Sequence, residues 1–330
     1  MGARFPRRLA IWLWTVVSML ACTLAGAPDS NAQAYPARPV TIIVPFGPGS
    51  GNDVIARIVA QKVSENWGNP VVVDNRPGAS GAIGMEVTAR AAPDAHTIVI
   101  ASTSHIVNQF VSKVRYDMLK DFAPVGLINY VPYGLVVTPG LPANTMRELI
   151  DLARGAPGKF NVASPGVGTP NHLGAAQLMA LTGIELVHVP YKVIGQTTAD
   201  LLSGQVSLWF PTMPGVMQHI KGGRMTALGV SGSRRAPALP NVPTIAEAGV
   251  PGYDASTWYP LLAPAGTPSA IVDKLNAQLV IILAMPDVRE KLQAQGIEPV
   301  GSSPAQLSMH LKSELVKWEK VVRMSGAKVD

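Results

Sequence analysis

A glycine-rich turn joins an apolar, β-branched segment to an amphipathic helix near the start of the chain. The stretch reads TIIVPFGPGSGNDVIARIVA, residues 41–60, with glycine at Gly47, Gly49 and Gly51. Glycine lets backbone N–H groups point out of a tight curve, and the helix that follows adds unpaired N–H groups and the positive end of its dipole. Such a turn can hold an anion, which could be a dinucleotide pyrophosphate, a nucleotide phosphate or a carboxylate.

A second turn of the same kind lies in NVASPGVGTPNHLGAAQLMALTG, residues 161–183. Gly166 and Gly168 free its backbone, and Thr169 followed by Pro170 is a strong signal for a helix start. In open α/β sheets, ligands bind outside the carboxyl ends of the strands. Two such loops facing across a cleft would hold a ligand from both sides. The alternative is that both are ordinary turns whose glycines only permit tight geometry.

Other chemistry fits the sequence less well. The dinucleotide fingerprint G-x-G-x-x-G would need glycine where Asn52 stands, and the Lys-Ser/Thr ending of a P-loop is absent. GVSGS, residues 229–233, misses the last position of the hydrolase motif G-x-S-x-G. The six histidines show neither metal-ligand spacing nor an acidic partner at a fixed offset, so each is interpreted as a surface or capping residue. We therefore expect no catalysis, metal or cofactor, and only His172 lies beside a candidate loop.

Asp53 stands in the first turn of the first predicted helix, where a carboxylate would repel an anionic ligand. It can cap backbone N–H groups, pair with Arg57 one turn on, or meet a ligand ammonium group, and the first two roles are favoured. A helix terminus contributes only about 0.3–1 kcal/mol, whereas micromolar binding needs about 8 kcal/mol. Hydrogen bonds, direct or through water, must therefore supply most of the affinity.

The first 34 residues indicate export. Three arginines precede an apolar run over residues 9–24, and the AQA of residues 32–34 offers a small-x-small cleavage site. The run has about 16 residues, fewer than the about 20 that span a membrane. We predict a signal peptide cleaved after Ala34 and a periplasmic protein. Cleavage removes Cys22, the only cysteine, and with it any disulfide; lipoprotein processing at Cys22 stays an open alternative.

Removing residues 1–34 leaves 24 basic and 20 acidic residues, so the formal net charge falls from +6 to +4. No Lys/Arg run interleaved with aromatic residues remains, and we expect no nucleic-acid partner. The 296 residues that remain exceed what one hydrophobic core usually holds, which predicts two lobes.

Short apolar runs alternate with helical patterns, as in the βαβ units of parallel sheets. The clearest helix follows the first glycine turn, where Ile55, Val59 and Val63 recur at the spacing of one helix face. The end of the chain predicts three helices, near residues 268–284, 286–295 and 304–324, with no strand among them. Strands are predicted at 39–46, 70–75, 96–102, 125–138, 159–164, 185–191, 206–210 and 225–231.

Two segments are predicted to cross between the lobes. Pro132 interrupts the long run 125–138 and cannot donate to a strand ladder. STWYPLLAPAGTP, residues 256–268, leads from a proline-rich loop to the C-terminal helices. Two crossings make a hinge with a cleft between the lobes. The predicted lobes are residues 35–130 plus 262–330, and residues 131–261.

Several motifs in combination resemble the Bug family of extracytoplasmic solute receptors, the periplasmic binding components of tripartite tricarboxylate transporters. The similarity covers nearly all of residues 35–330. It implies the α/β fold of type II periplasmic binding proteins, whose two lobes close on a carboxylate ligand, and it implies no catalysis. The motifs are YPARPVTIIVPFGPGSGNDVIAR, VVVDNRPGASGAIG, SPGVGTPNHL, VHVPYK, DLLSGQV, LPNVPTIAEAGVPGY and WYPLLAPAGTP.

The resemblance also implies membrane transporter subunits as partners, and we expect the receptor itself to be a monomer. An orphan receptor that presents its carboxylate to a sensor kinase stays an alternative. The alternative from another class is an exported hydrolase that acts on acyl or phosphate esters.

In the Bug family, the loop after the first strand and the glycine loop of the second lobe bind a ligand carboxylate, in part through ordered water. The resemblance places these loops at residues 46–53 and 164–172. A side chain at Gly51 is expected to obstruct the ligand without disturbing the fold, because the turn lies on the surface. The candidate ligand-binding residues are Phe46, Gly47, Pro48, Gly49, Ser50, Gly51, Asp53, Ser164, Gly166, Val167, Gly168, Thr169, His172 and Thr212.

The chain departs from the Bug pattern at several positions. Ser50 stands where the family usually has glycine, and Asn52 where Thr or Ser is common, so a side chain is expected to enter the site. YKVIGQTTAD lacks the glycine that usually follows Tyr-Lys, and no Asp or Asn follows Phe210. The role of Lys192 and the identity of the carboxylate therefore stay open.

Overall fold

The structure, a computed structural model, describes residues 35–191, 194–237, 239–294 and 297–325. Residues 38–330 form one compact unit, to which all elements below belong. The predicted signal peptide with Cys22, its cleavage site and Lys192 lie outside the described residues. Within the described ranges, no single helix is long and apolar enough to span a membrane. The helix pair Ser269–Ala284 and Pro286–Ala294 has that length and composition only across a bend of 72°.

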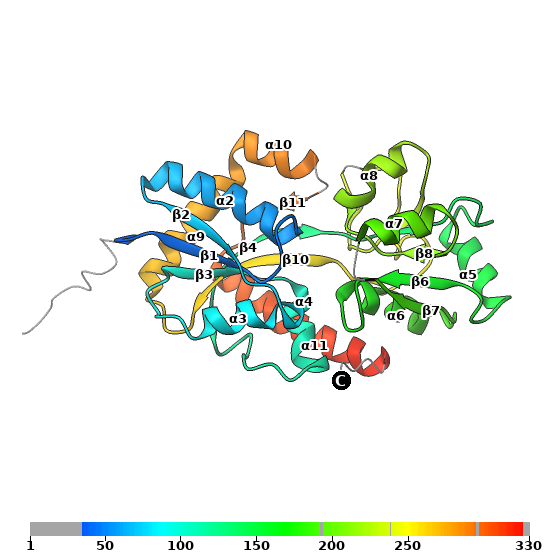
Figure 1. Ribbon diagram of the computed structural model, residues 1–330, viewed down its shortest axis with the longest axis horizontal. Coiled ribbons are helices and arrows are strands. Elements are labelled where there is room, and N and C mark those ends of the chain that lie inside the picture. Colours follow the sequence, from blue (N-terminus) through cyan, green and yellow to red (C-terminus); the bar gives the residue numbers. More distant parts are fainter. Residues whose placement is uncertain (1–34, 192–193, 238, 295–296, 326–330) are drawn as a thin grey trace, which may run out of the picture. The chain divides into compact units, whose positions relative to one another are not determined.

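The first sheet has six strands in the order β11-β4-β10-β3-β1-β2 (Figure 1). β1 is parallel to β2 and β3, as the alternating strand and helix patterns predict, whereas β10 runs antiparallel between β3 and β4. The strands are β1 (Val40–Val44), β2 (Val71–Asn75), β3 (Thr97–Ile100), β4 (Phe122–Val131), β10 (Thr257–Pro264) and β11 (Glu298–Pro299).

Helices cover both faces of the first sheet. α2 (Gly51–Trp67) packs on β1, β2 and α9 (Ser269–Ala284), and it buries Ile55, Val59 and Val63 as its apolar spacing predicts. α3 (Ala82–Ala89), α4 (Thr103–Val111) and α11 (Pro304–Ser325) pack near one another. Figure 1 shows α2 on one side of this sheet and α3 and α11 on the other.

The second sheet has five strands in the order β7-β6-β8-β5-β9. Alternate residues of β5 face opposite ways: Val136 packs in one core cluster with residues of α7 and α8, whereas Leu135 and Val137 pack in another with residues of α5 and α6. The elements are β5 (Gly134–Val137), α5 (Met146–Arg154), β6 (Asn161–Ser164), α6 (Pro170–Thr182), β7 (Val187–Pro190), α7 (Ile194–Leu202), β8 (Leu208–Trp209), α8 (Met213–Lys221) and β9 (Thr226–Val230).

The predicted long run 125–138 does pass from one sheet to the other. Pro132 stands in the break between β4, which belongs to the first sheet, and β5, which belongs to the second. The chain returns to the first sheet in β10, which begins at Thr257. The lobe boundaries at 130/131 and 261/262 stay predictions.

The C-terminal helices α9, α10 (Pro286–Ala294) and α11 lie where they were predicted, but the expectation that no strand lies among them is wrong. β11 follows α10 and pairs antiparallel with Tyr130 and Asn129 of β4. It has only two residues, too few to show an alternating pattern, so the sequence carries no signal for it.

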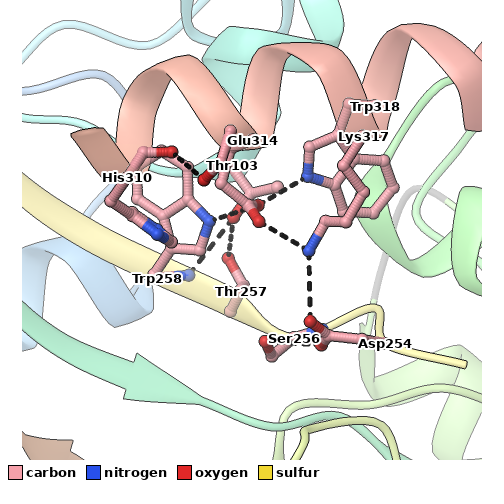
Figure 2. Close-up of polar contacts among 10 residues, drawn as sticks. Thr103, Asp254, Ser256, Thr257, Trp258, His310, Glu314, Lys317 and Trp318 are labelled. Atoms are coloured by element: carbon pink, nitrogen blue, oxygen red, sulfur yellow. Dashed lines mark hydrogen bonds and ion pairs between the residues drawn. The ribbon is translucent and has the colours of Figure 1, made fainter. Parts of the chain in front are cut away.

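A buried carboxylate fastens α11 to β10 (Figure 2). Glu314 is 6% exposed, and its Oε2 accepts hydrogen bonds from the indole Nε1–H groups of Trp258 at 2.7 Å and Trp318 at 2.9 Å. Its Oε1 lies 2.6 Å from the Nζ of Lys317, which also contacts the carboxylate of Asp254 at 3.3 Å. Both tryptophans are fully buried, so these bonds fix the position of α11 on the sheet.

Candidate functional site: two glycine loops at helix starts

The loop between β1 and α2 is held from inside by Asp53, whose side chain is 4% exposed. Its carboxylate accepts a hydrogen bond from the Gly49 N–H at 2.9 Å and pairs with the Arg57 guanidinium through two contacts, at 2.9 and 3.0 Å. The Asn75 amide donates to Asp53 at 3.0 Å and to the Phe46 carbonyl at 3.0 Å. The predicted capping and pairing roles of Asp53 are confirmed. We call Gly49, Asp53, Arg57 and Asn75 the Asp53 clasp.

The other three residues of the Asp53 clasp lower the pKa of the Asp53 carboxyl. Burial alone would raise the pKa of Asp53, but hydrogen bonds from Arg57, Gly49 and Asn75 outweigh it, and the pKa lies below its usual value. Asp53 is therefore ionised at neutral pH and neutralised by Arg57. The carboxylate accepts its hydrogen bonds from residues around the loop.

Three N–H groups of the first loop, those of Gly49, Ser50 and Asp53, already have protein acceptors. The Ser50 N–H donates to the Gly47 carbonyl at 3.3 Å, and the Ser50 hydroxyl caps the helix by accepting from the Asp53 N–H at 3.3 Å. Among the described residues, the N–H groups of Gly51 and Asn52 have no protein acceptor. The open donors thus include the first two amides of α2, and the N–H groups of Phe46 and Gly47 also have no protein acceptor among the described residues. The Gly49 N–H, in contrast, donates within the loop to Asp53.

The expectation that a side chain at Gly51 leaves the fold undisturbed is wrong. A Cβ at Gly51 would lie 2.6 Å from the hydroxyl oxygen of Tyr259, a residue of β10 that is 5% exposed. Gly51 therefore packs on a buried side chain, although the turn is on the surface. Gly47 differs, because nothing lies within 4 Å of its Cβ position.

An asparagine near the start of each of the two helices ties that helix to a strand of the same sheet. The Asn52 amide donates to the carbonyls of Ile100 at 2.9 Å and Ala101 at 3.0 Å, and the Asn171 amide donates to the carbonyl of Phe210 at 2.6 Å. The Asn52 side chain therefore turns toward β3, which leaves Ser50 as the side chain expected to enter the site. Both helices have asparagine as their second residue. This shared feature of the two sequences indicates the bond to the strand, and sequence reasoning missed it.

The second loop is also bonded internally. Thr169 caps α6 as predicted, since its hydroxyl accepts from the His172 N–H at 3.4 Å and donates to the Gly166 carbonyl at 2.7 Å. The Gly166 N–H donates to the Ser164 hydroxyl at 3.1 Å, and the Gly168 N–H donates to the His172 Nδ1 at 3.2 Å. His172 therefore carries its proton on Nε2 when it is neutral.

Two N–H groups of the second loop have no protein acceptor among the described residues. They belong to Val167, whose side chain is exposed, and to Asn171 in the first turn of α6. Thr212 begins α8 as its N-cap residue without a side-chain capping bond, and it forms a backbone bridge with Tyr133 of the first crossing. The second loop thus presents open donors at a helix start, as the first loop does.

His188 of β7 contacts the second loop, although its sequence position gave no sign of this. Its ring lies 4.2 Å from the ring of His172, and its Nε2 is 2.6 Å from the Ser164 hydroxyl. Burial and the neighbouring His188 lower the pKa of His172 to about 4, and burial lowers the pKa of His188. Both rings are neutral at neutral pH, and their proximity opposes protonation of both.

We expect the protein to lose stability as the pH falls from about 6.5 toward 4. The folded-state pKa is about 4 for His172 and about 3 for His105, which is below the about 6.5 of an unfolded histidine. In this window the unfolded chain binds protons that the folded chain does not, so acid favours unfolding. Thermal unfolding from pH 7.5 to 4.5 measures the slope, which should be shallower for His172→Gln. An identical slope in both proteins would contradict this contribution of His172.

Phe46 rests on a fully buried histidine of α4. The rings of Phe46 and His105 are 5.4 Å apart, and the His105 Nδ1 accepts a hydrogen bond from the Ser102 N–H at 2.9 Å. Burial lowers the pKa of His105 to about 3. Its Nε2 lies against Gly81, where a side chain would collide with it. His105 is thus a neutral, buried residue beneath the first loop: it caps the start of α4 by accepting from the Ser102 N–H, as one of the two predicted roles has it, but it does not lie on the surface.

A pocket of about 360 Å³ lies elsewhere, where the first crossing meets α11. It contains none of the predicted ligand-binding residues. Its cations are already paired, Arg234 with Glu298 at 3.1 Å and Arg235 with Glu247 at 2.8 Å, so they leave no free partner for a carboxylate. In the described ranges, no group of three or more His, Cys, Asp or Glu side chains could hold a metal ion. We therefore assign the candidate site to the two glycine loops.

The chain matches a known receptor family over most of its length. A family model described as "Tripartite tricarboxylate transporter family receptor" matches residues 55–327. Protein BugT of Bordetella pertussis is 36% identical over 320 residues, which cover 96% of this chain and 98% of BugT.

Two solved structures extend the comparison to the fold. The R. palustris protein Rpa4515 with adipate is 35% identical with a TM-score of 0.80, over 89% of this chain and 99% of that one. MatC from Rhodopseudomonas palustris with bound malate is 31% identical with a TM-score of 0.75, over 87% and 100% of the two chains. This chain has the two-lobed α/β fold of type II periplasmic binding proteins, and it belongs to the Bug family of tripartite tricarboxylate transporter receptors.

Proposed function

We propose that this solute receptor captures a small carboxylate between its two glycine loops, in the periplasm, and delivers it to a tripartite tricarboxylate-type membrane transporter. Two relatives of the same family are structures with adipate and with malate, both of which are dicarboxylates. The protein acts as a monomer and without catalysis, and the lobes close on the ligand about the two crossing segments.

One observation carries the proposal: each sheet sends one strand through a glycine loop into a helix whose first amides have no protein acceptor among the described residues. These are Gly51 and Asn52 on α2, and Val167 and Asn171 around the start of α6. Backbone N–H groups at a helix start bind anions through hydrogen bonds and the helix dipole. Asp53 does not oppose an anion there, because Arg57 neutralises it.

We expect carboxylates to raise the thermal unfolding temperature of the purified mature protein. A ligand that binds only the folded state at 100 times its Kd adds about 2.7 kcal/mol to the free energy of unfolding. The panel contains adipate, malate, citrate, benzoate and glutamate, with glucose as the uncharged control. Stabilisation by glucose alone, with none by any carboxylate, would contradict carboxylate binding. Steady consumption of the bound carboxylate in a turnover assay would contradict a receptor without catalysis.

A further inference from the structure

The hydroxyl of a buried tyrosine lies at the start of α2. Tyr259 comes from β10, is 5% exposed, and places its hydroxyl oxygen 2.6 Å from where a Cβ of Gly51 would stand. Gly51 is the first residue of α2, and its N–H and that of Asn52 have no protein acceptor among the described residues. The hydroxyl and the two amides therefore lie at the same helix end.

This hydroxyl has no hydrogen-bond partner in the described part of the chain. The hydroxyls of three other buried tyrosines each have one. Tyr253 donates to the Gly174 carbonyl at 3.1 Å, Tyr116 donates to the His105 carbonyl at 2.8 Å, and Tyr133 bonds to Thr257. The Tyr259 side chain is buried, but its hydroxyl oxygen is not among the fully buried atoms without a partner, so it keeps access to solvent and to a ligand at this helix end. Burial raises the pKa of Tyr259 to about 12, so its hydroxyl keeps its proton at neutral pH and can donate it.

We propose that Tyr259 is a ligand-binding residue whose hydroxyl donates a hydrogen bond to the carboxylate held by the first amides of α2. This inference rests on the proposed function and adds one side-chain donor to it. A hydrogen bond to a charged acceptor is about twice as strong as a neutral one, and a donor on a buried side chain is held in place before the ligand arrives. The proposal also explains why position 51 is glycine, since any side chain there would displace this hydroxyl.

Tyr259→Phe tests the inference, with Tyr253→Phe as the matched control. Tyr259→Phe removes no described hydrogen bond within the protein, so the unfolding temperature without ligand should stay within about 1 °C of wild type. The Kd of the tightest-binding panel carboxylate, measured by calorimetry, should rise about tenfold or more. Tyr253→Phe should do the opposite: it loses a buried hydrogen bond and melts lower, but it binds that carboxylate as wild type does.

The outcomes separate the inference from the proposed function. A wild-type protein that binds no panel carboxylate overturns both. A wild type that binds, with a Tyr259→Phe variant of the same Kd, overturns only the role of Tyr259. Gly51→Ala gives an independent check, because its methyl group must displace the hydroxyl: it should weaken binding in the wild type and weaken it less in Tyr259→Phe. Equal weakening in both backgrounds would contradict the contact.

Discussion

Gly47→Asp should abolish carboxylate binding while leaving the protein folded. Nothing lies within 4 Å of the Cβ position of Gly47, and its φ is outside the left-handed region, so a Cβ there causes neither a collision nor backbone strain. Gly47 lies in the same loop as the open amides of Gly51 and Asn52, so we expect the added carboxylate to repel a ligand carboxylate held there. Two charges about 4 Å apart repel by about 4 kcal/mol at the effective dielectric of a protein surface, which corresponds to more than a 100-fold loss of affinity.

Gly47→Asn is the matched control, because it has the same shape as Gly47→Asp without the charge. We expect its Kd for the tightest-binding panel carboxylate to rise less than tenfold, and both variants to melt within about 2 °C of wild type. Calorimetric titration of the three proteins decides the question. Wild-type affinity in a folded Gly47→Asp protein would remove the first loop from the site.

Glu314→Leu should greatly lower the free energy of unfolding. Position 314 lies outside both glycine loops, so this prediction concerns the fold and not the candidate site. The substitution leaves the buried indole N–H groups of Trp258 and Trp318 without their acceptor, and it leaves Lys317 without its nearer carboxylate. Unpaired buried donors cost about 1–3 kcal/mol each. Lys317 adds less, because its side chain is partly exposed and keeps its contact with Asp254. We expect a loss of about 3–5 kcal/mol in urea unfolding, a large share of the about 5–15 kcal/mol of a typical protein.

Two control variants locate the cause of this loss. Glu314→Gln keeps a carbonyl oxygen for the indoles but replaces the oxygen beside Lys317 with an amide NH2, so it should cost less than Glu314→Leu, about 1–2 kcal/mol. Glu319→Gln breaks an exposed pair with Arg323 on the same helix and should cost less than about 0.5 kcal/mol. If Glu314→Leu unfolded at the same urea concentration as Glu319→Gln, the buried carboxylate would not be what fastens α11 to β10.

The sequence predicted those parts of the site whose signals are local. An apolar run, a glycine turn and a capping residue fit within about 20 residues, so the start of α2 and the Thr169 cap of α6 could be found from spacing alone. Pro132 identified the break between β4 and β5 for the same reason, because proline acts on its own residue and its immediate neighbours.

The parts that were missed depend on contacts between distant segments. Tyr259 reaches Gly51 only because β10 returns to the first sheet beside β3, and no periodicity specifies that pairing. His188 meets Ser164 only in the register that sets β7 beside β6. The prediction that a side chain at Gly51 would leave the fold undisturbed failed for the same reason, since the sequence shows the glycine but not that Tyr259 packs against it.

The Asp53 clasp has a consequence for the rates of binding. Its hydrogen bonds and ion pair lie entirely within the protein, so in the proposed site the first loop is held in shape before a ligand arrives. A pre-organised site does not pay the entropy of ordering a loop on association. Related carboxylates should therefore reach this loop at similar association rates. Selectivity among them is then set by how long each stays bound, which is where most differences between related complexes lie.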